Sequence, residues 1–160
     1  MQKLTAVLLC LTLLLSFTGC GVKPSEQVTE TDWITVIRAD LYGEDSALSR
    51  AMDKAVELKL TGADGDTVTV EVTAPDVSGE VLEWFLSVSE EEYSDAALES
   101  LLLKLLKGDT TTAVYELPIG SDGKPRYTDP FLDAASCGVR KFYSALTAMF
   151  MDEMEANTDE

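Results

Sequence analysis

The sequence predicts an α+β domain in which an antiparallel sheet of about four strands, built from two hairpins, packs against helices. The sheet is indicated by residues 56–60 and 68–72, where apolar and polar side chains alternate on either side of a turn-rich stretch. The helices are indicated by apolar residues that recur three and four positions apart in residues 94–108 and again in residues 130–150. Local hairpins combined with separate helices are typical of α+β architecture.

The chain begins with an apolar segment that ends in a cysteine. A base at Lys3 precedes an apolar run from Leu4 to Phe17, and the small pair Thr18-Gly19 directly precedes Cys20. This is the organisation of a secretory signal. A helix over the apolar run would span about 21 Å, less than the ~30 Å hydrocarbon core of a bilayer, so a permanent membrane span is disfavoured.

The ending Phe17-Thr18-Gly19-Cys20 resembles a bacterial lipobox, with Phe17 where the usual motif has leucine. The resemblance implies that a peptidase removes residues 1–19, that Cys20 is diacylated, and that the mature protein is held at the extracytoplasmic face of the cell membrane. Lipid on Cys20 would bind the chain to the membrane, which is therefore an expected partner. Two alternatives stay open: an ordinary cleaved signal of a secreted protein, and an uncleaved anchor.

Charge and composition exclude several functional classes. The net charge is −17, and it becomes −18 when residues 1–19, which hold one base and no acid, are removed. Such a surface repels nucleic acid, so no nucleic-acid partner is expected. The chain has no histidine, which removes the Ser-His-Asp and Cys-His catalytic arrangements and the imidazole ligands of most catalytic zinc sites. We therefore expect a protein that is not an enzyme and that uses no cofactor or metal.

The mature chain is long enough for one domain. We expect the lipidated cysteine and a short tether over residues 20–31, a single α+β domain over residues 32–151, and an acidic tail over residues 152–160. Apolar spacing predicts two helical pieces within residues 33–41 and 47–55, separated at Gly43. Alternation then predicts a hairpin from Val56 to Thr73, with its turn over residues 62–66.

The second half is predicted to contain two further helices, a second hairpin and a final helix. The first helix lies near residues 81–88, and the next is capped by Ser94 or Asp95 and stops at Gly108. A strand over residues 110–117 is expected to pair with a short strand through Arg126 and Tyr127. Asp129 is then expected to cap the final helix, with Pro130 at its first position, and Gly138 bends or breaks this helix.

This order of elements resembles NTF2-like (cystatin-like) α+β domains, particularly those of small lipoproteins of Gram-positive bacteria. The resemblance depends on VTVEVTAPD at residues 68–76, on SDAALESLLLKLLKGD at residues 94–109, and on TDPFLDAASCG at residues 128–138. It implies a sheet that curves around a cleft, and most members of the family have no assigned function.

Three patterns have both a chemical and a structural interpretation. Cys137 precedes Arg140 and Lys141 by three and four positions, a spacing that on one helix would lower the thiol pKa, although a structural role is favoured. Asp64 and Asp66 lack the further ligands of a calcium loop and indicate a turn. Met149, Met151 and Met154 fit a terminal amphipathic helix better than a copper site.

Four aromatic side chains are candidates for a ligand cleft between the sheet and the helices: Trp33, Trp84, Tyr115 and Tyr127. The sequence therefore predicts a non-enzymatic binding or interaction module anchored to the membrane. The alternative is a small-molecule or peptide-binding lipoprotein with a pocket between sheet and helices. The least favoured hypothesis is an enzyme that acts in that pocket.

Overall fold

The domain is an α+β structure of six helices and one three-stranded antiparallel sheet within residues 30–156, which are the residues that the computed structural model describes. The helices are α2 (Glu30–Tyr42), α3 (Ala47–Ala55), α4 (Ser78–Ser87), α5 (Asp95–Leu105), α6 (Asp129–Ala135) and α7 (Val139–Ala156). The strands are β1 (Glu57–Asp64), β2 (Thr67–Ala74) and β3 (Thr111–Pro118), in the spatial order β1-β2-β3. The predicted α+β class is confirmed.

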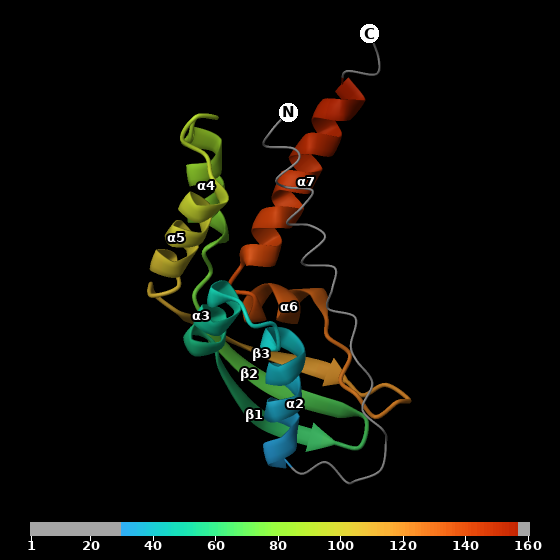
Figure 1. The fold of residues 1–160 in the computed structure, drawn as a ribbon. Coiled ribbons are helices and arrows are strands. Elements are labelled where there is room, and N and C mark those ends of the chain that lie inside the picture. Colours follow the sequence, from blue (N-terminus) through green and yellow to red (C-terminus); the bar gives the residue numbers. More distant parts are fainter. Residues whose placement is uncertain (1–29, 157–160) are drawn as a thin grey trace.

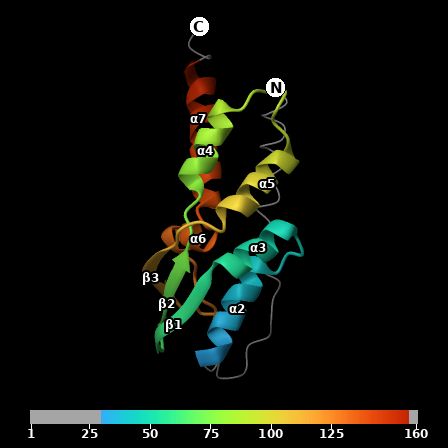
Figure 2. The ribbon, with the colours of Figure 1, turned by 90° about the vertical axis from the view of Figure 1, so that its left-hand side faces the viewer.

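The sheet lies at one end of an elongated molecule, and its helices form two groups (Figures 1 and 2). Helices α2 and α6 pack against one face of the sheet, on β1 and β2 respectively. Helices α4, α5 and α7 extend beyond the end of the sheet, with α4 beside α7. The other face of the sheet is left without a covering helix among the described elements (Figure 1).

The first hairpin forms where the alternation predicts it. β1 and β2 pair antiparallel from Glu57↔Thr73 to Asp64↔Thr67, with a bulge between Leu60 and Gly62. At the turn, Asp64 Oδ1 accepts hydrogen bonds from the backbone N–H groups of Asp66 and Thr67. These two aspartates therefore form the turn, as expected, and the described residues contain no cluster of three acidic or cysteine ligands for a metal.

The core is built from the buried face of β2 and the inner faces of the helices. Val68, Val70 and Val72 are buried, whereas the intervening Thr69 and Glu71 on the opposite face are half-buried. The buried side chains that the helices contribute to the core include Ile37, Val81, Phe85, Leu98, Leu102, Phe131, Phe142 and Leu146. Burial of these alternating and helically spaced apolar residues is the main driving force for this fold.

The ends of α5 follow the predicted signals, whereas the start of α6 does not. The Ser94 side chain caps α5 by accepting a hydrogen bond from Ala97 N at 3.1 Å, and Ser46 caps α3 in the same way. At α6 the N-cap residue is Thr128, which makes no side-chain hydrogen bond there, and Asp129 already lies in the helix. Gly108 N donates to Leu105 O just after α5 ends. The separation of the first two helices at Gly43 is also as predicted.

The second hairpin differs from the expectation of a fourth strand. β3 pairs with β2 in a continuous antiparallel register from Thr67↔Pro118 to Ala74↔Thr111. After the turn, pairing of the returning chain is reduced to one isolated bridge between Ile119 and Pro125. Pro118 accepts a hydrogen bond from Arg126 N but has no N–H to donate to Arg126 in return, and the chain then turns away toward α6, so the sheet has three strands within residues 30–156.

The predicted final helix is broken at Gly138 into α6 and α7. Cys137 and Gly138 both have left-handed backbone angles, with φ of 54° and 78°. At its other end α7 continues to Ala156, five residues past the predicted C-terminal boundary of the domain at residue 151. Helix α2 begins at Glu30, two residues before the predicted N-terminal boundary at residue 32.

Candidate functional site

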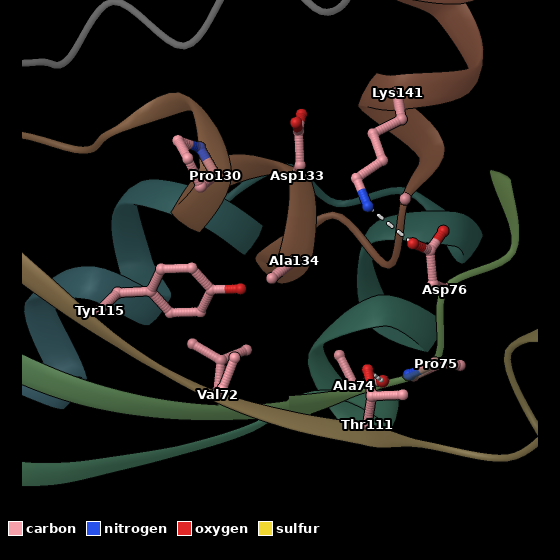
Figure 3. A pocket seen from close by; sticks show the side chains of 12 residues that line it. Val72, Ala74, Pro75, Asp76, Thr111, Tyr115, Pro130, Asp133, Ala134 and Lys141 are labelled. Carbon is pink, nitrogen blue, oxygen red and sulfur yellow. Dashed lines mark hydrogen bonds and ion pairs between the residues drawn. The ribbon is translucent and has the colours of Figure 1, made fainter.

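A groove of about 80 Å³ lies between the sheet and the start of the last two helices. Small apolar side chains form its floor: Val72, Ala74, Ala113 and Ala134. Polar groups surround this floor: Tyr115, Asp76, Asp133 and Lys141 (Figure 3). The groove therefore combines an apolar base with fixed charges at its rim.

An ion pair joins the loop before α4 to the first turn of α7. Lys141 Nζ donates to Asp76 Oδ2 at 2.7 Å, as the dashed line in Figure 3 shows. The other carboxylate oxygen of Asp76 accepts hydrogen bonds from the N–H and the hydroxyl of Ser78, at 3.1 and 2.6 Å. The pair thus ties the residues that begin α4 to the helix packed beside it.

Both members of this pair are held in their charged forms. Partial burial acts to raise the pKa of Asp76, but the hydrogen bonds from Lys141 and Ser78 outweigh it, so the pKa is lowered. The hydrogen bond to Asp76 raises the pKa of Lys141. Neither group therefore titrates near neutral pH, where a general acid or base is most effective.

A tight turn between α6 and α7 makes this pairing possible. Gly138 N donates to Asp133 O at 2.8 Å, and Cys137 O accepts from Val77 N at 2.9 Å. A Cβ at Gly138 would run into Asp76 Oδ1. Glycine is needed here both for its positive φ and for this close approach.

Cys137 is fully buried within this turn. Burial, with a smaller effect of the Asp76 charge, raises its pKa to about 12. The two cations expected beside it pair elsewhere: Lys141 contacts Asp76, and Arg140 contacts Asp129 at 2.6 Å and Asp133 at 3.0 Å. The thiol is therefore protonated and unreactive at neutral pH, which agrees with the structural interpretation.

The four aromatic candidates occupy separate places. Tyr115 lines the groove, and its ring meets Phe131 edge-on at 5.8 Å. Tyr127 stacks on Phe131 at 5.5 Å, and its hydroxyl donates to Asp40 at 2.8 Å. The structure thus brings Tyr115 and Tyr127 together across one phenylalanine.

The two tryptophans lie away from this cluster. Trp84 is on α4, where its ring lies 6.2 Å from that of Tyr93. Trp33 is on α2 and packs, half-buried, against the core. Neither lines the groove.

Searches against protein-family models, curated proteins and solved structures give no match. What the groove can bind is therefore inferred from its lining residues and their contacts.

Other features of the sequence contribute no site within the described residues. Met149 and Met151 are exposed on α7, and the side chain of Met154 lies outside the described part. Within residues 30–156 no helix is both long and apolar enough to cross a bilayer. Cys20, the expected lipid attachment site, and most of the tether lie outside the described residues.

The charged residues of the groove were not identified from the sequence. In the sequence Asp76 marks only the end of a strand, and Lys141 is only a neighbour of Cys137. These two residues are 65 positions apart, and no periodic pattern links such positions. Tyr115 was the one lining residue among the candidates.

Proposed function

We propose that the protein is a membrane-anchored extracytoplasmic lipoprotein whose domain is a non-enzymatic binding module. The observation that carries the binding role is the groove, in which charged groups are fixed by ion pairs and hydrogen bonds over an apolar floor. Asp76 and Lys141 are held in their charged forms near neutral pH, and the neighbouring thiol of Cys137 is buried. These features suit recognition better than proton transfer or nucleophilic attack.

The size of the groove favours one of the two kinds of ligand considered from the sequence. Pockets for drug-sized molecules usually measure about 300–1,000 Å³, whereas this groove measures about 80 Å³. A single side chain of a peptide or protein fits this space better than a whole small molecule. We therefore place a peptide or protein ligand ahead of a small-molecule ligand.

The membrane part of the proposal is supported by the apolar segment that ends in Thr18-Gly19-Cys20. The finer assignment to NTF2-like domains is also part of the proposal, and its support is the antiparallel sheet with helices packed on one face.

Mass spectrometry of the chain isolated from native membranes tests the anchor. We expect a mature N-terminus at Cys20 that carries lipid, and we expect Cys20→Ala to release the chain from the membrane fraction. An unmodified N-terminus at any other residue would contradict the lipoprotein assignment.

Photo-crosslinking in the same membranes tests the binding role. A photoreactive residue at Ala113, which is exposed and lines the groove, should give a discrete crosslinked product. The matched control is Thr61, an exposed position on β1, and it should give none. Absence of any product at Ala113 would refute a binding role for the groove.

A further inference from the structure

The outer edge of β3 presents unpaired backbone groups. Ile119 N donates inward to Asp66 O, whereas Pro118 O accepts from Arg126 N on the outer side. Backbone groups alternate in direction along an antiparallel strand, so Thr112, Val114 and Glu116 share the outward direction of Pro118. Their outward N–H and C=O groups have no partner within residues 30–156. We call these three residues the β3 edge.

This edge lacks the features that normally prevent strands from pairing with other chains. Thr111, Thr112, Ala113 and Val114 are all exposed, and Val114 is 58 % exposed. Residues 111–115 contain no charge, Glu116 is the single charged residue of the strand, no proline precedes Pro118, and the register with β2 has no bulge. A regular and exposed edge with a single charge near its end is a ready template for an added strand.

The groove lies directly beside the β3 edge. Thr111, Ala113 and Tyr115 alternate with the edge residues, and all three line the groove. An added strand would also direct alternate side chains to the two faces of the sheet. One of those side chains would therefore lie over the apolar floor between β3 and α6 (Figure 3).

Tyr115 offers this ligand a free polar group. Its hydroxyl points across the groove toward Ala134 in Figure 3, and it makes no hydrogen bond within the described residues. Backbone pairing supplies affinity in strand addition, and pockets for alternate side chains supply specificity. The β3 edge offers the backbone groups, and the groove offers the pocket for a side chain.

The charges around the groove favour one kind of added strand over another. The charged residues around the groove and the edge are five acids, Asp76, Glu116, Asp122, Asp129 and Asp133, and three bases, Arg126, Arg140 and Lys141. All three bases are already engaged by acids. The whole chain carries −17, so a second copy would bring a like charge, whereas a basic peptide is attracted.

We propose that the β3 edge is a strand-addition site for an extended basic peptide segment, which places a small apolar side chain in the groove. The proposal rests on the proposed function, because it names the partner class of the same groove. The peptide adds as a fourth strand beside β3, and the sheet order becomes β1-β2-β3-peptide.

The test uses the full chain purified in detergent micelles and a fluorescently labelled peptide, acetyl-Lys-Thr-Val-Thr-Val-Lys-amide. Fluorescence anisotropy measures its binding, and hydrogen exchange followed by mass spectrometry locates it. We expect saturable binding that slows exchange across residues 111–117. A twin peptide with glutamate in place of both lysines should bind at least about tenfold more weakly.

Two variants separate the edge from the groove. Val114→Pro removes an outward N–H but no bond to β2, so the fold should persist while binding falls about tenfold or more. Val114→Thr keeps the N–H and should bind within about twofold of the unmodified chain. Ala113→Leu fills the groove without altering the edge and should also weaken binding about tenfold. Circular dichroism checks that each variant is folded.

The results either support strand addition or overturn it. Absence of binding, equal binding of the acidic twin, or equal binding to folded Val114→Pro would each overturn it. Concentration-dependent dimerisation of the chain without peptide, lost in Val114→Pro, would assign the edge to a second copy. If crosslinking at Ala113 succeeds while Val114→Pro has no effect on that product or on peptide binding, the binding module stands and strand addition fails.

Discussion

The two edges of the sheet are built differently. On β1, the covered face carries Leu58, which is buried beside α2, and the strand is interrupted by a bulge between Leu60 and Gly62. Charged side chains at Glu57 and Lys59 stand on the opposite face. On β3, the exposed stretch has neither a charge nor a bulge before Glu116. One edge is therefore protected and contributes to the core, while the other is left open to pairing with a further strand.

The largest expected effect contrasts a buried side chain of β1 with an exposed one of β3. Leu58→Ala should lower the free energy of unfolding by about 2–4 kcal/mol, because it removes apolar contacts and leaves a cavity. Val114→Thr should change it by less than about 0.5 kcal/mol. Urea denaturation of both variants checks the contrast. Equal losses would show that the β3 edge is part of the stabilising structure.

The next effect concerns the wall of the groove beside β3. Gly138→Ala should cost about 2 kcal/mol, because φ is 78° and the new Cβ would meet Asp76. The matched control is Gly79→Ala in α4, where the added methyl meets nothing within 4 Å. That change should be neutral or stabilising by up to about 1 kcal/mol. Thermal unfolding measures both, and a neutral Gly138→Ala would mean that the turn tolerates another backbone conformation.

A smaller effect should appear in the acid dependence of stability. The pKa of Asp76 is lowered in the folded state from an ordinary value of 3.8, so at acid pH the unfolded chain binds this proton more readily. The contribution of the carboxylate is therefore complete above the ordinary pKa and is lost as pH falls through the folded-state pKa.

Because the Asp76 side chain is 42 % exposed, this contribution should be less than about 1 kcal/mol. Asp76→Asn should flatten the dependence of unfolding free energy on pH below about pH 4 relative to the unmodified chain. Denaturant titrations at a series of pH values measure it, and parallel curves for the two proteins would exclude the ion pair as a source of acid sensitivity.

The smallest effect is expected at the charged residue of the protected edge. Lys59 Nζ lies 3.5 Å from Glu71 Oε1, and the lysine side chain is 65 % exposed. Lys59→Thr should therefore alter stability by less than about 0.5 kcal/mol, because exposed ion pairs contribute little. Urea denaturation checks this value, and a loss above 1 kcal/mol would show that the charge on β1 stabilises the sheet as well as protecting it.

Local patterns were enough to predict most of the elements. The alternation at Val68, Val70 and Val72 identified β2, and Ser94 marked the start of α5, because such signals are contained in neighbouring residues. The pairing of β3 with β2 and the Asp76–Lys141 pair join residues far apart in sequence. These two pairings form only when α4 and α5, which lie between the partners or beside them, bring the chain back, and no local sequence pattern predicts that.

The break at Gly138 shows an intermediate case. The glycine indicated a bend or a break, but apolar spacing continued across it from Phe131 to Phe142. What decides the break is the contact of Cys137 O with Val77 N and of Gly138 with Asp76. Asp76 and Val77 lie in the segment between β2 and α4, far from Gly138 in the sequence. The sequence alone therefore left both a bend and a break open.

The long connection between β2 and β3 has a consequence for the order of folding. β1 and β2 are joined by a two-residue turn, whereas the β2–β3 partners are separated by 37 residues at Ala74↔Thr111 and by 51 at Thr67↔Pro118. Closing the longer loop costs more entropy, so the first hairpin should form early and β3 should join late. Until then β2 itself is an open edge, and a newly synthesised chain must complete its own sheet before another strand occupies that place.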